Sequence, residues 1–265
     1  MLLYGRERLV YASVWRVSRA AGCRNIPAVL CDSPSVQTDS SAGVGPRQAF
    51  LIVGVLAVGL ALDVRTDFIG QAVLGVVIWV VLFYLLRRID PTVRWALLAC
   101  LVIATAGELF LSLVWGLYTY RLENVPFFVP PGHAMLLLLG IRLAQRMSTR
   151  TAHAILGCAA AYALVAGVTG IDTLALPLLA MLAVVSYLLP THRTLYASTF
   201  LLALALELYG TWLGNWWWSR EVPVLALVTT NPPGIASAFY AVLDALVACT
   251  ALALGRRFRS PAYAN

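Results

Sequence analysis

The sequence predicts an all-α polytopic membrane protein with about eight transmembrane helices, arranged as two parallel four-helix repeats. Composition is the first observation behind this prediction. Of 265 residues, 61% are hydrophobic and only 12% are charged, whereas a soluble domain carries about 25% charged residues. The second observation is a series of apolar runs long enough to span a bilayer. The third is an ordered set of polar residues that occurs once in each half of the chain.

The apolar runs follow one another along most of the chain, and each approaches the roughly 20 residues that a helix needs to cross the hydrocarbon core. Pro177 lies in the sixth run, which a packed membrane helix tolerates. Ahead of the last run, Asn231 fits an N-cap and Pro232 fits the first helical position. The expected spans cover residues 48–64, 68–86, 93–118, 127–145, 151–169, 173–190, 194–217 and 233–254.

The segment before these runs has a different composition, with arginine, serine and the polar stretch CDSPSVQTDSSAGVGP. It lacks an apolar stretch followed by a small-residue cleavage site, so we expect no signal peptide. We interpret residues 1–46 as a disordered cytoplasmic tail and residues 258–265 as a second cytoplasmic tail. Residues 47–146 and 147–257 are then the two four-helix repeats.

Arginines between the expected helices predict the orientation. They gather in alternate loops, whereas Arg65, Arg121 and Arg220 in the opposite loops each have an acid nearby. The positive-inside rule, like the even number of helices, then places both termini in the cytoplasm, and we expect the bacterial inner (plasma) membrane. Arg121 and Arg220 become interfacial residues on the outer side. The arginines of the cytoplasmic loops are Arg87, Arg88, Arg94, Arg142, Arg146, Arg150 and Arg193.

The net charge of +7 suits cytoplasmic loops and anionic lipid. No nucleic-acid motif is visible, so the expected partner is a membrane lipid or another lipophilic small molecule rather than nucleic acid. Cys23 and Cys31 have no partners at metal-ligand spacing, and the other three cysteines lie inside apolar runs. We therefore expect no metal site and no cofactor, while the oligomeric state stays open.

The repeated polar set starts from one glutamate in each half, Glu108 and Glu207. Each is followed by a hydroxyl four residues on, an arginine thirteen residues on, a Val-Pro pair and a Pro-Pro-Gly turn. Parallel repeats commonly place a site at the interface between their halves. The alternative is that the match arose by chance, because the sequence uses few residue types and most of them are apolar. The matched pairs are Ser112 with Thr211, Arg121 with Arg220, and 130–132 with 232–234.

Three acids lie well inside apolar runs: Glu108, Glu207 and Asp244. A charged carboxylate in mid-membrane costs about 3 kcal/mol on insertion scales. These side chains should therefore face the bundle interior or a water-filled cavity, where a protonated carboxylic acid can donate its proton to a substrate. We take all three as candidate catalytic residues. The alternative is structural, with nearby hydroxyls binding the acids and joining helices.

Residues at helical spacing from the acids are candidates for binding the substrate. Ser112 and Trp115 follow Glu108 by four and seven residues, and Thr211 follows Glu207 by four. Tyr240 precedes Asp244 by four residues, and Tyr118 lies at the outer end of its helix.

His133 follows the first Pro-Pro-Gly and begins the fourth expected helix. A helix N-terminus disfavours imidazolium, so we expect a neutral, hydrogen-bonding side chain. His133 is a candidate second acid/base group. The alternative is an ordinary interfacial histidine.

The stretch ELFLSLVWGLYTYR and the VPFFVPPGH that follows it resemble the carotenoid-biosynthesis integral membrane proteins typified by bisanhydrobacterioruberin hydratase. Those proteins carry a membrane glutamate followed by a Gly-x-Tyr-x-Tyr element and a Val-Pro-rich loop. The second half of this chain lacks the pattern. The resemblance implies addition of water across an isoprenoid double bond by cofactor-free acid/base chemistry. The matching residues here are Glu108, Gly116, Tyr118, Tyr120, Val125 and Pro126.

Three functions stay open on these observations. In an enzyme acting on an isoprenoid or other lipid, Glu108 would protonate the substrate and Glu207 or Asp244 would hold water or stabilise a carbocation. In a proton-coupled transporter or lipid flippase, the same acids would relay protons. In a non-catalytic membrane assembly protein, the acids would be structural. An apolar tunnel that ends at Glu108 favours the enzyme, and a wet path open to both sides favours the transporter.

Overall fold

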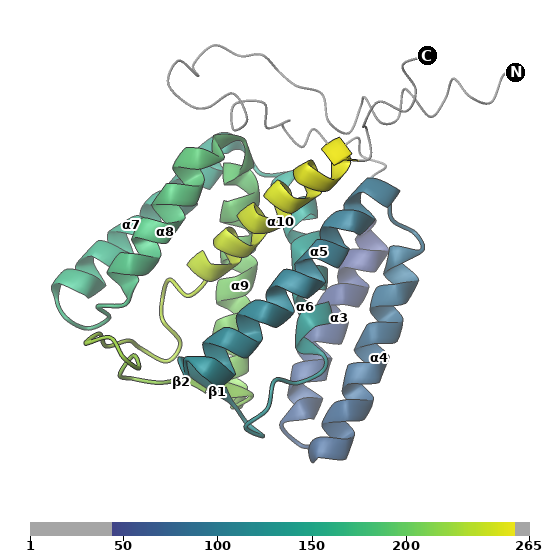
Figure 1. The fold of residues 1–265 in the computed structure, drawn as a ribbon, viewed down its shortest axis with the longest axis horizontal. Helices are drawn as coiled ribbons and strands as arrows, with labels where there is room; N and C mark the ends of the chain where they lie inside the picture. Colours follow the sequence, from purple (N-terminus) through teal and green to yellow (C-terminus); the bar gives the residue numbers. More distant parts are fainter. Residues whose placement is uncertain (1–43, 258–265) are drawn as a thin grey trace, which may run out of the picture.

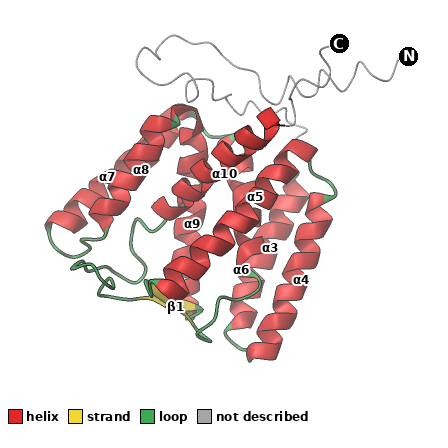
Figure 2. Ribbon diagram, viewed as in Figure 1, coloured by secondary structure: helices red, strands yellow, loops and turns green. Residues whose placement is uncertain are grey.

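The computed structural model describes residues 44–257, so nearly all of the expected tails, 1–46 and 258–265, lie outside the described residues. The described chain is mostly helical and contains eight α-helices (Figure 1; Figure 2). Each expected run contains one of them, which confirms the all-α class. The helices are α3 (Pro46–Asp63), α4 (Phe68–Leu86), α5 (Pro91–Glu108), α6 (Val129–Ala144), α7 (Thr149–Val168), α8 (Ala175–Leu188), α9 (Arg193–Leu213) and α10 (Ala238–Arg257).

Five helical segments are long and apolar enough to cross a membrane, as expected for an integral membrane protein. The other three apolar helices of the described chain are shorter. The long segments are Pro46–Asp63, Phe68–Leu86, Val93–Val114, Thr149–Val168 and Pro190–Leu213, and the shorter ones are Val129–Ala144, Ala175–Leu188 and Ala238–Ala253.

The third expected span, 93–118, is not one regular helix. The α-helical part ends at Glu108, a π-helix runs over Leu109–Val114, and Gly116 turns the chain with φ +73° into strand β1 (Tyr118–Tyr120). The seventh expected span, 194–217, likewise stops early, because α9 ends at Gly214 in the left-handed conformation. Strand β2 (Trp216–Trp218) follows it. The hydropathy pattern did not reveal these two helix ends, because the residues that follow them are still aromatic.

Strands β1 and β2 pair with each other in antiparallel register, with Tyr118 opposite Trp218 and Tyr120 opposite Trp216. The pairing gives both segments backbone hydrogen-bond partners outside a helix, which chain inside or beside a membrane requires. It joins the segment that follows α5 to the segment that follows α9, about a hundred residues later in the chain. The expected spans 93–118 and 194–217 had instead included Tyr118, Trp216 and Trp217 in helices.

The start of the last helix also differs from the expectation. Helix α10 begins at Ala238 rather than at residue 233, after a series of turns. Asn231 does not cap it, because the Asn231 side-chain oxygen accepts a hydrogen bond from the backbone N–H of Trp218 at 2.9 Å. This loop residue therefore holds β2 instead of starting a helix.

Four helices, α5, α6, α9 and α10, pack against one another in the middle of the molecule. Helices α3 and α4 lie on one side and contact α6, while α7 and α8 lie on the other side and contact α9 and α10 respectively. In Figure 1 the strands lie at the bottom of the bundle, opposite the first residues of α3 and the last residues of α10. We call this the strand end. The opposite end is called the arginine-rich end, because the connections that carry Arg87, Arg88, Arg146 and Arg193 lie there.

A polar cluster around Asp63 fixes the strands to α3 and α4. The Asp63 side chain is only 1% exposed and accepts hydrogen bonds from Gln71 at 2.8 Å and Asn215 at 2.9 Å. Arg121 lies 3.6 Å from the Asp63 carboxylate and donates to the carbonyls of Asp63 and Thr66. Arg121 is thus a clamp between β1 and the end of α3, a more specific role than the interfacial one expected. The Arg220 side chain is exposed.

We predict that Asp63→Ala destabilises the protein by about 3–5 kcal/mol, because it leaves Arg121 and Asn215 facing each other without the buried acceptor they share. Thermal unfolding in detergent, followed by the loss of monodisperse protein, measures the effect. Asp67→Asn is the matched control, since Asp67 is an exposed N-cap that accepts from Gly70 and asparagine caps equally well, to within about 0.5 kcal/mol. An Asp63→Ala protein as stable as this control would contradict the assigned role.

Candidate functional site

A cavity of about 250 Å³ lies between the two halves of the bundle near the strand end. Its walls come from α3, α4, α5, α6, α9 and α10 and from both strands. Most of the lining is aliphatic, including Leu56, Ile78, Ala104 and Leu243. The polar side chains of the lining are grouped around two glutamates. The cavity is therefore apolar with one polar region.

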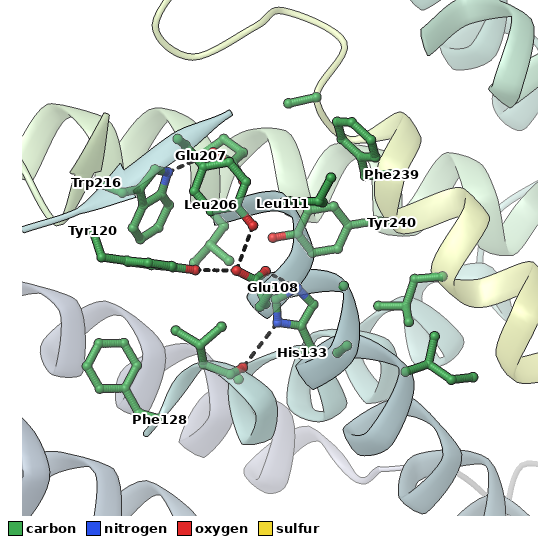
Figure 3. A pocket seen from close by; sticks show the side chains of 18 of the residues that line it. Glu108, Leu111, Tyr120, Phe128, His133, Leu206, Glu207, Trp216, Phe239 and Tyr240 are labelled. Atoms are coloured by element: carbon green, nitrogen blue, oxygen red, sulfur yellow. Dashed lines mark hydrogen bonds and ion pairs between the residues drawn. The ribbon is translucent and has the colours of Figure 1, made fainter. Parts of the chain in front are cut away.

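Glu108 is the centre of that polar region (Figure 3). It is 8% exposed and lies where the α-helical part of α5 ends. Its Oε2 atom accepts hydrogen bonds from the hydroxyls of Tyr118 at 2.7 Å and Tyr120 at 2.6 Å. Burial, and then the neighbouring Glu108 carboxyl, raise the pKa of both tyrosines well above their usual value. Both hydroxyls therefore keep their protons and act as donors at physiological pH.

His133 approaches the other oxygen of Glu108, with Nε2 at 3.2 Å from Oε1. On its far side, Nδ1 lies 3.1 Å from the carbonyl oxygen of Val129. A carbonyl can only accept, so Nδ1 carries a hydrogen. The contact between Nε2 and Oε1 then needs one proton, which either atom can hold. Glu108 and His133 together form a pair with one transferable proton, at the junction of α5 and α6.

Glu207 faces the same region from α9 and is 6% exposed. Its Oε2 atom accepts hydrogen bonds from the indole N–H groups of Trp216 at 2.9 Å and Trp218 at 3.0 Å. An indole nitrogen is a donor only and does not take up a proton. Glu207 is therefore held by indoles whose protons stay in place, whereas Glu108 also contacts His133, which can take up or release a proton.

The strand pair sets this geometry. Alternate residues of a strand point to the same face, so Tyr118 and Tyr120 on β1 and Trp216 and Trp218 on β2 all project toward the cavity. The rings contact across the strands, with centroids 4.8 Å apart for Tyr118 and Trp218 and 6.0 Å apart for Tyr120 and Trp216. Each glutamate thus receives two donors from the strand that follows its own helix.

Asp244 is buried but does not line the cavity. Its Oδ2 atom lies 2.7 Å from the hydroxyl of Thr199, one turn of α10 beyond Tyr240. The same hydroxyl lies 2.9 Å from the carbonyl oxygen of Leu195. One hydroxyl hydrogen can be shared between two acceptors, so Thr199 bridges the Asp244 carboxyl and the backbone of α9. Asp244 joins α10 to α9 and is not among the residues that line the cavity.

Of the expected substrate-binding residues, the structure brings Tyr118 and Tyr240 to the cavity but not Ser112, Trp115 or Thr211. The π-helix explains why Ser112 and Trp115 do not line the cavity. Its wider turn displaces residues after Glu108 from the face that α-helical spacing predicts. The Trp115 indole donates to the carbonyl of Pro223 at 2.8 Å. The Thr211 hydroxyl donates to the backbone carbonyl of Glu207 at 2.7 Å. These three residues do not line this cavity, and their expected role in substrate binding stays a prediction.

The sequence analysis missed the partners of the glutamates. Neither Trp216 nor Trp218 was a candidate site residue, and Tyr120 entered only through the resemblance. A signal was present in the sequence, because Tyr-Thr-Tyr and Trp-Trp-Trp both place aromatics two residues apart, ten and twelve residues after Glu108 and nine and eleven residues after Glu207. That spacing is typical of a strand.

His133 and Tyr240 bring the α6 and α10 walls together. Their rings stack with centroids 5.1 Å apart and planes 4° apart. Across the described residues, no group of three or more histidine, cysteine, aspartate or glutamate side chains is placed to hold a metal ion.

Comparison with protein-family models, with curated proteins and with solved structures finds no match to this chain. The resemblance to carotenoid-biosynthesis proteins stays a hypothesis. The function has to be argued from the cavity itself.

We predict that His133 is protonated on Nδ1 at every pH at which the protein is folded, because the Val129 carbonyl accepts from that atom. Solid-state NMR of protein labelled with ¹⁵N-histidine distinguishes the two ring nitrogens. His133→Gln removes the signal and so assigns it among the three histidines of the chain. A neutral His133 that carries its only hydrogen on Nε2 would contradict the shared-proton arrangement.

We predict that Gly210→Ala disturbs the site by displacing Trp216, since a Cβ at position 210 overlaps the Trp216 ring. Overpacking of this kind costs roughly 1–3 kcal/mol, and moving the ring breaks its bond to Glu207. Unfolding temperature and tryptophan emission measure the two effects. Gly157→Ala in α7 is the control, because open space surrounds that position. There, alanine should leave the emission unchanged and raise stability by about 0.5–1 kcal/mol.

Proposed function

We propose that this protein is a membrane enzyme that performs cofactor-free acid/base chemistry on a lipophilic substrate. The observation that carries the proposal is the Glu108–His133 pair, which shares one proton in the polar part of an otherwise apolar cavity. The reaction we favour is hydration of an isoprenoid double bond, in line with the resemblance noted above.

The lining supports a lipophilic substrate. Its aliphatic walls on α3, α4, α5 and α10 offer an apolar chain the same environment as the bilayer core. Two lining residues, Phe110 and Leu246, are also 53% and 48% exposed on the surface of the bundle. The cavity therefore reaches the lipid-facing surface near α5 and α10, where a substrate dissolved in the bilayer can enter.

The proposed reaction uses the groups in a definite order. The proton shared by Glu108 and His133 passes to one carbon of the double bond, and the positive charge that develops on the other carbon faces Glu207. A water molecule then forms a C–O bond to that carbon and returns one proton to the Glu108–His133 pair. The net change is the addition of one water, with no electrons gained or lost.

The strand contacts support the proposal of two parallel repeats. In each half a glutamate lies six residues before the last residue of its span, Val114 or Leu213, and is bound by two aromatic donors of the strand that follows. The donors are tyrosines in the first half and tryptophans in the second. We infer that an original symmetric site has divided its roles between proton transfer and charge stabilisation.

With this repeat we propose eight membrane helices, including the three shorter ones, and both termini in the cytoplasm of a bacterial cell. The arginine-rich end then faces the cytoplasm, and the strand end with its cavity faces outward.

Proton-coupled transport is the second candidate. The buried Asp244 favours it, since this third carboxyl, bonded to Thr199 of α9, lies one turn of α10 beyond the cavity-lining Tyr240 toward the arginine-rich end. An enzyme needs no carboxyl there. A purely structural role, as in a non-catalytic assembly protein, does not account for the cavity.

Lipid mass spectrometry on cells that express wild type, Glu108→Gln or His133→Gln at equal levels tests the enzyme. We expect a lipid heavier by one water molecule in wild type only, because each variant breaks the shared proton pair. Glu221→Gln is the matched control. It makes the same chemical change at an exposed acid away from the cavity and should behave as wild type.

The enzyme proposal fails if the lipid profiles of all four strains agree. It also fails if Glu108→Gln makes as much of the new lipid as wild type. Agreement of all four profiles, together with pH-driven flux of a lipophilic solute in proteoliposomes, would favour the transporter.

A further inference from the structure

The charges that line the cavity do not balance. Glu108 is matched by His133, and the pair is neutral overall because it holds one shared proton. Glu207 has only neutral partners: the indoles of Trp216 and Trp218 and the hydroxyl of Tyr240. No arginine lines the cavity among the described residues, and the chain has no lysine. An ionised Glu207 therefore leaves one uncompensated negative charge inside an apolar bundle.

A buried charge without a partner is costly, so Glu207 needs either a proton or a positive charge brought by a ligand. The donors around it allow the second choice. Both indole N–H groups point at Oε2 and favour the carboxylate form. In the ionised form, the carboxylate can meet a cation in the cavity through its other oxygen.

The rings beside Glu207 form an aromatic enclosure around that oxygen. Trp218 contacts Tyr118 at 4.8 Å and stacks with Phe239 at 6.4 Å and 19° between planes. Tyr240, stacked on His133, closes the opposite side beside Glu207. Faces of tryptophan and tyrosine attract cations, ammonium groups above all. The aliphatic walls continue from this enclosure toward Leu243 and Leu246 on α10.

We propose that the cavity binds an amphiphile with one positive charge, an alkylammonium in chemical class. The charged group lies between Glu207 and the rings of Trp218 and Tyr240, and the alkyl chain lies along α5 and α10. This inference rests on the proposed function in that it names the kind of molecule that the same site takes. In a substrate, the charge is either permanent or appears during the reaction.

Decyltrimethylammonium is a suitable probe, since its charge does not depend on pH. Equilibrium binding of the radiolabelled probe is measured on protein in phosphatidylcholine nanodiscs at pH 7, with empty nanodiscs subtracted. We expect saturable binding at one site per chain. Glu207→Gln should weaken it at least tenfold, because it removes the only uncompensated charge, and Glu221→Gln should leave it unchanged. Decanol, which has the same chain and no charge, should not compete at tenfold excess.

Tryptophan variants provide a second measurement that does not depend on the folding of Glu207→Gln. Trp218→Phe keeps a ring face at the site and should retain affinity within about threefold, whereas Trp218→Leu should lose at least tenfold. Size-exclusion profiles select the variants that remain monodisperse. The inference is overturned if binding does not saturate, if decanol competes as well as the ammonium, or if Phe and Leu at position 218 bind equally.

The outcomes separate this inference from the proposed enzyme. Charge-selective binding without any change in lipid profiles would keep the cation site and reject the hydratase. A hydrated lipid without ammonium binding would keep the enzyme and place a proton, rather than a ligand, on Glu207.

Discussion

Two carboxylates buried in an apolar bundle need hydrogen-bond donors, and the rest of the site follows from how they obtain them. Neither Glu108 nor Glu207 finds its donors on its own helix. Each takes two from a three-residue strand beyond the helix end. Because β1 and β2 pair with each other, the donors of both glutamates are held as one unit. An unpaired carboxylate at this depth would cost several kcal/mol, so the strand pair and the acids depend on each other.

The helix breaks are part of the same arrangement. A regular helix through Tyr118 would distribute the aromatics around its circumference. The π-helix over Leu109–Val114 and the turns at Gly116 and Gly214 end α5 and α9 before the aromatic segments. The two segments can then fold back and pair as β1 and β2. π-Helical turns occur often at functional sites, because they shift side chains out of the α-helical register. Here the shift leaves Glu108 at the cavity and moves Ser112 away from it.

The two halves use different chemistry on one geometric plan. Tyrosine hydroxyls both donate and accept, and His133 adds a base that the second half lacks, where Ile235 follows the second Pro-Pro-Gly. Tryptophan can only donate. In the proposed reaction, proton exchange is therefore concentrated at Glu108, and Glu207 serves as a fixed charge or acceptor. The polar cluster of Asp63, Arg121 and Asn215 ties this unit to α3 and α4, so that the cavity wall on that side keeps its place.

The sequence by itself determined the membrane character, the all-α class, the approximate position of each apolar helix and the three acids that needed an explanation. These depend on composition and on local hydropathy, which a single chain displays directly. Only the tertiary structure decided which residues meet Glu108 and Glu207, that Asp244 bonds Thr199 instead of lining the cavity, and that Arg121 closes on Asp63. Each of these contacts joins segments that are distant in the chain or lie beyond a helix break, and helical periodicity carries no information about either.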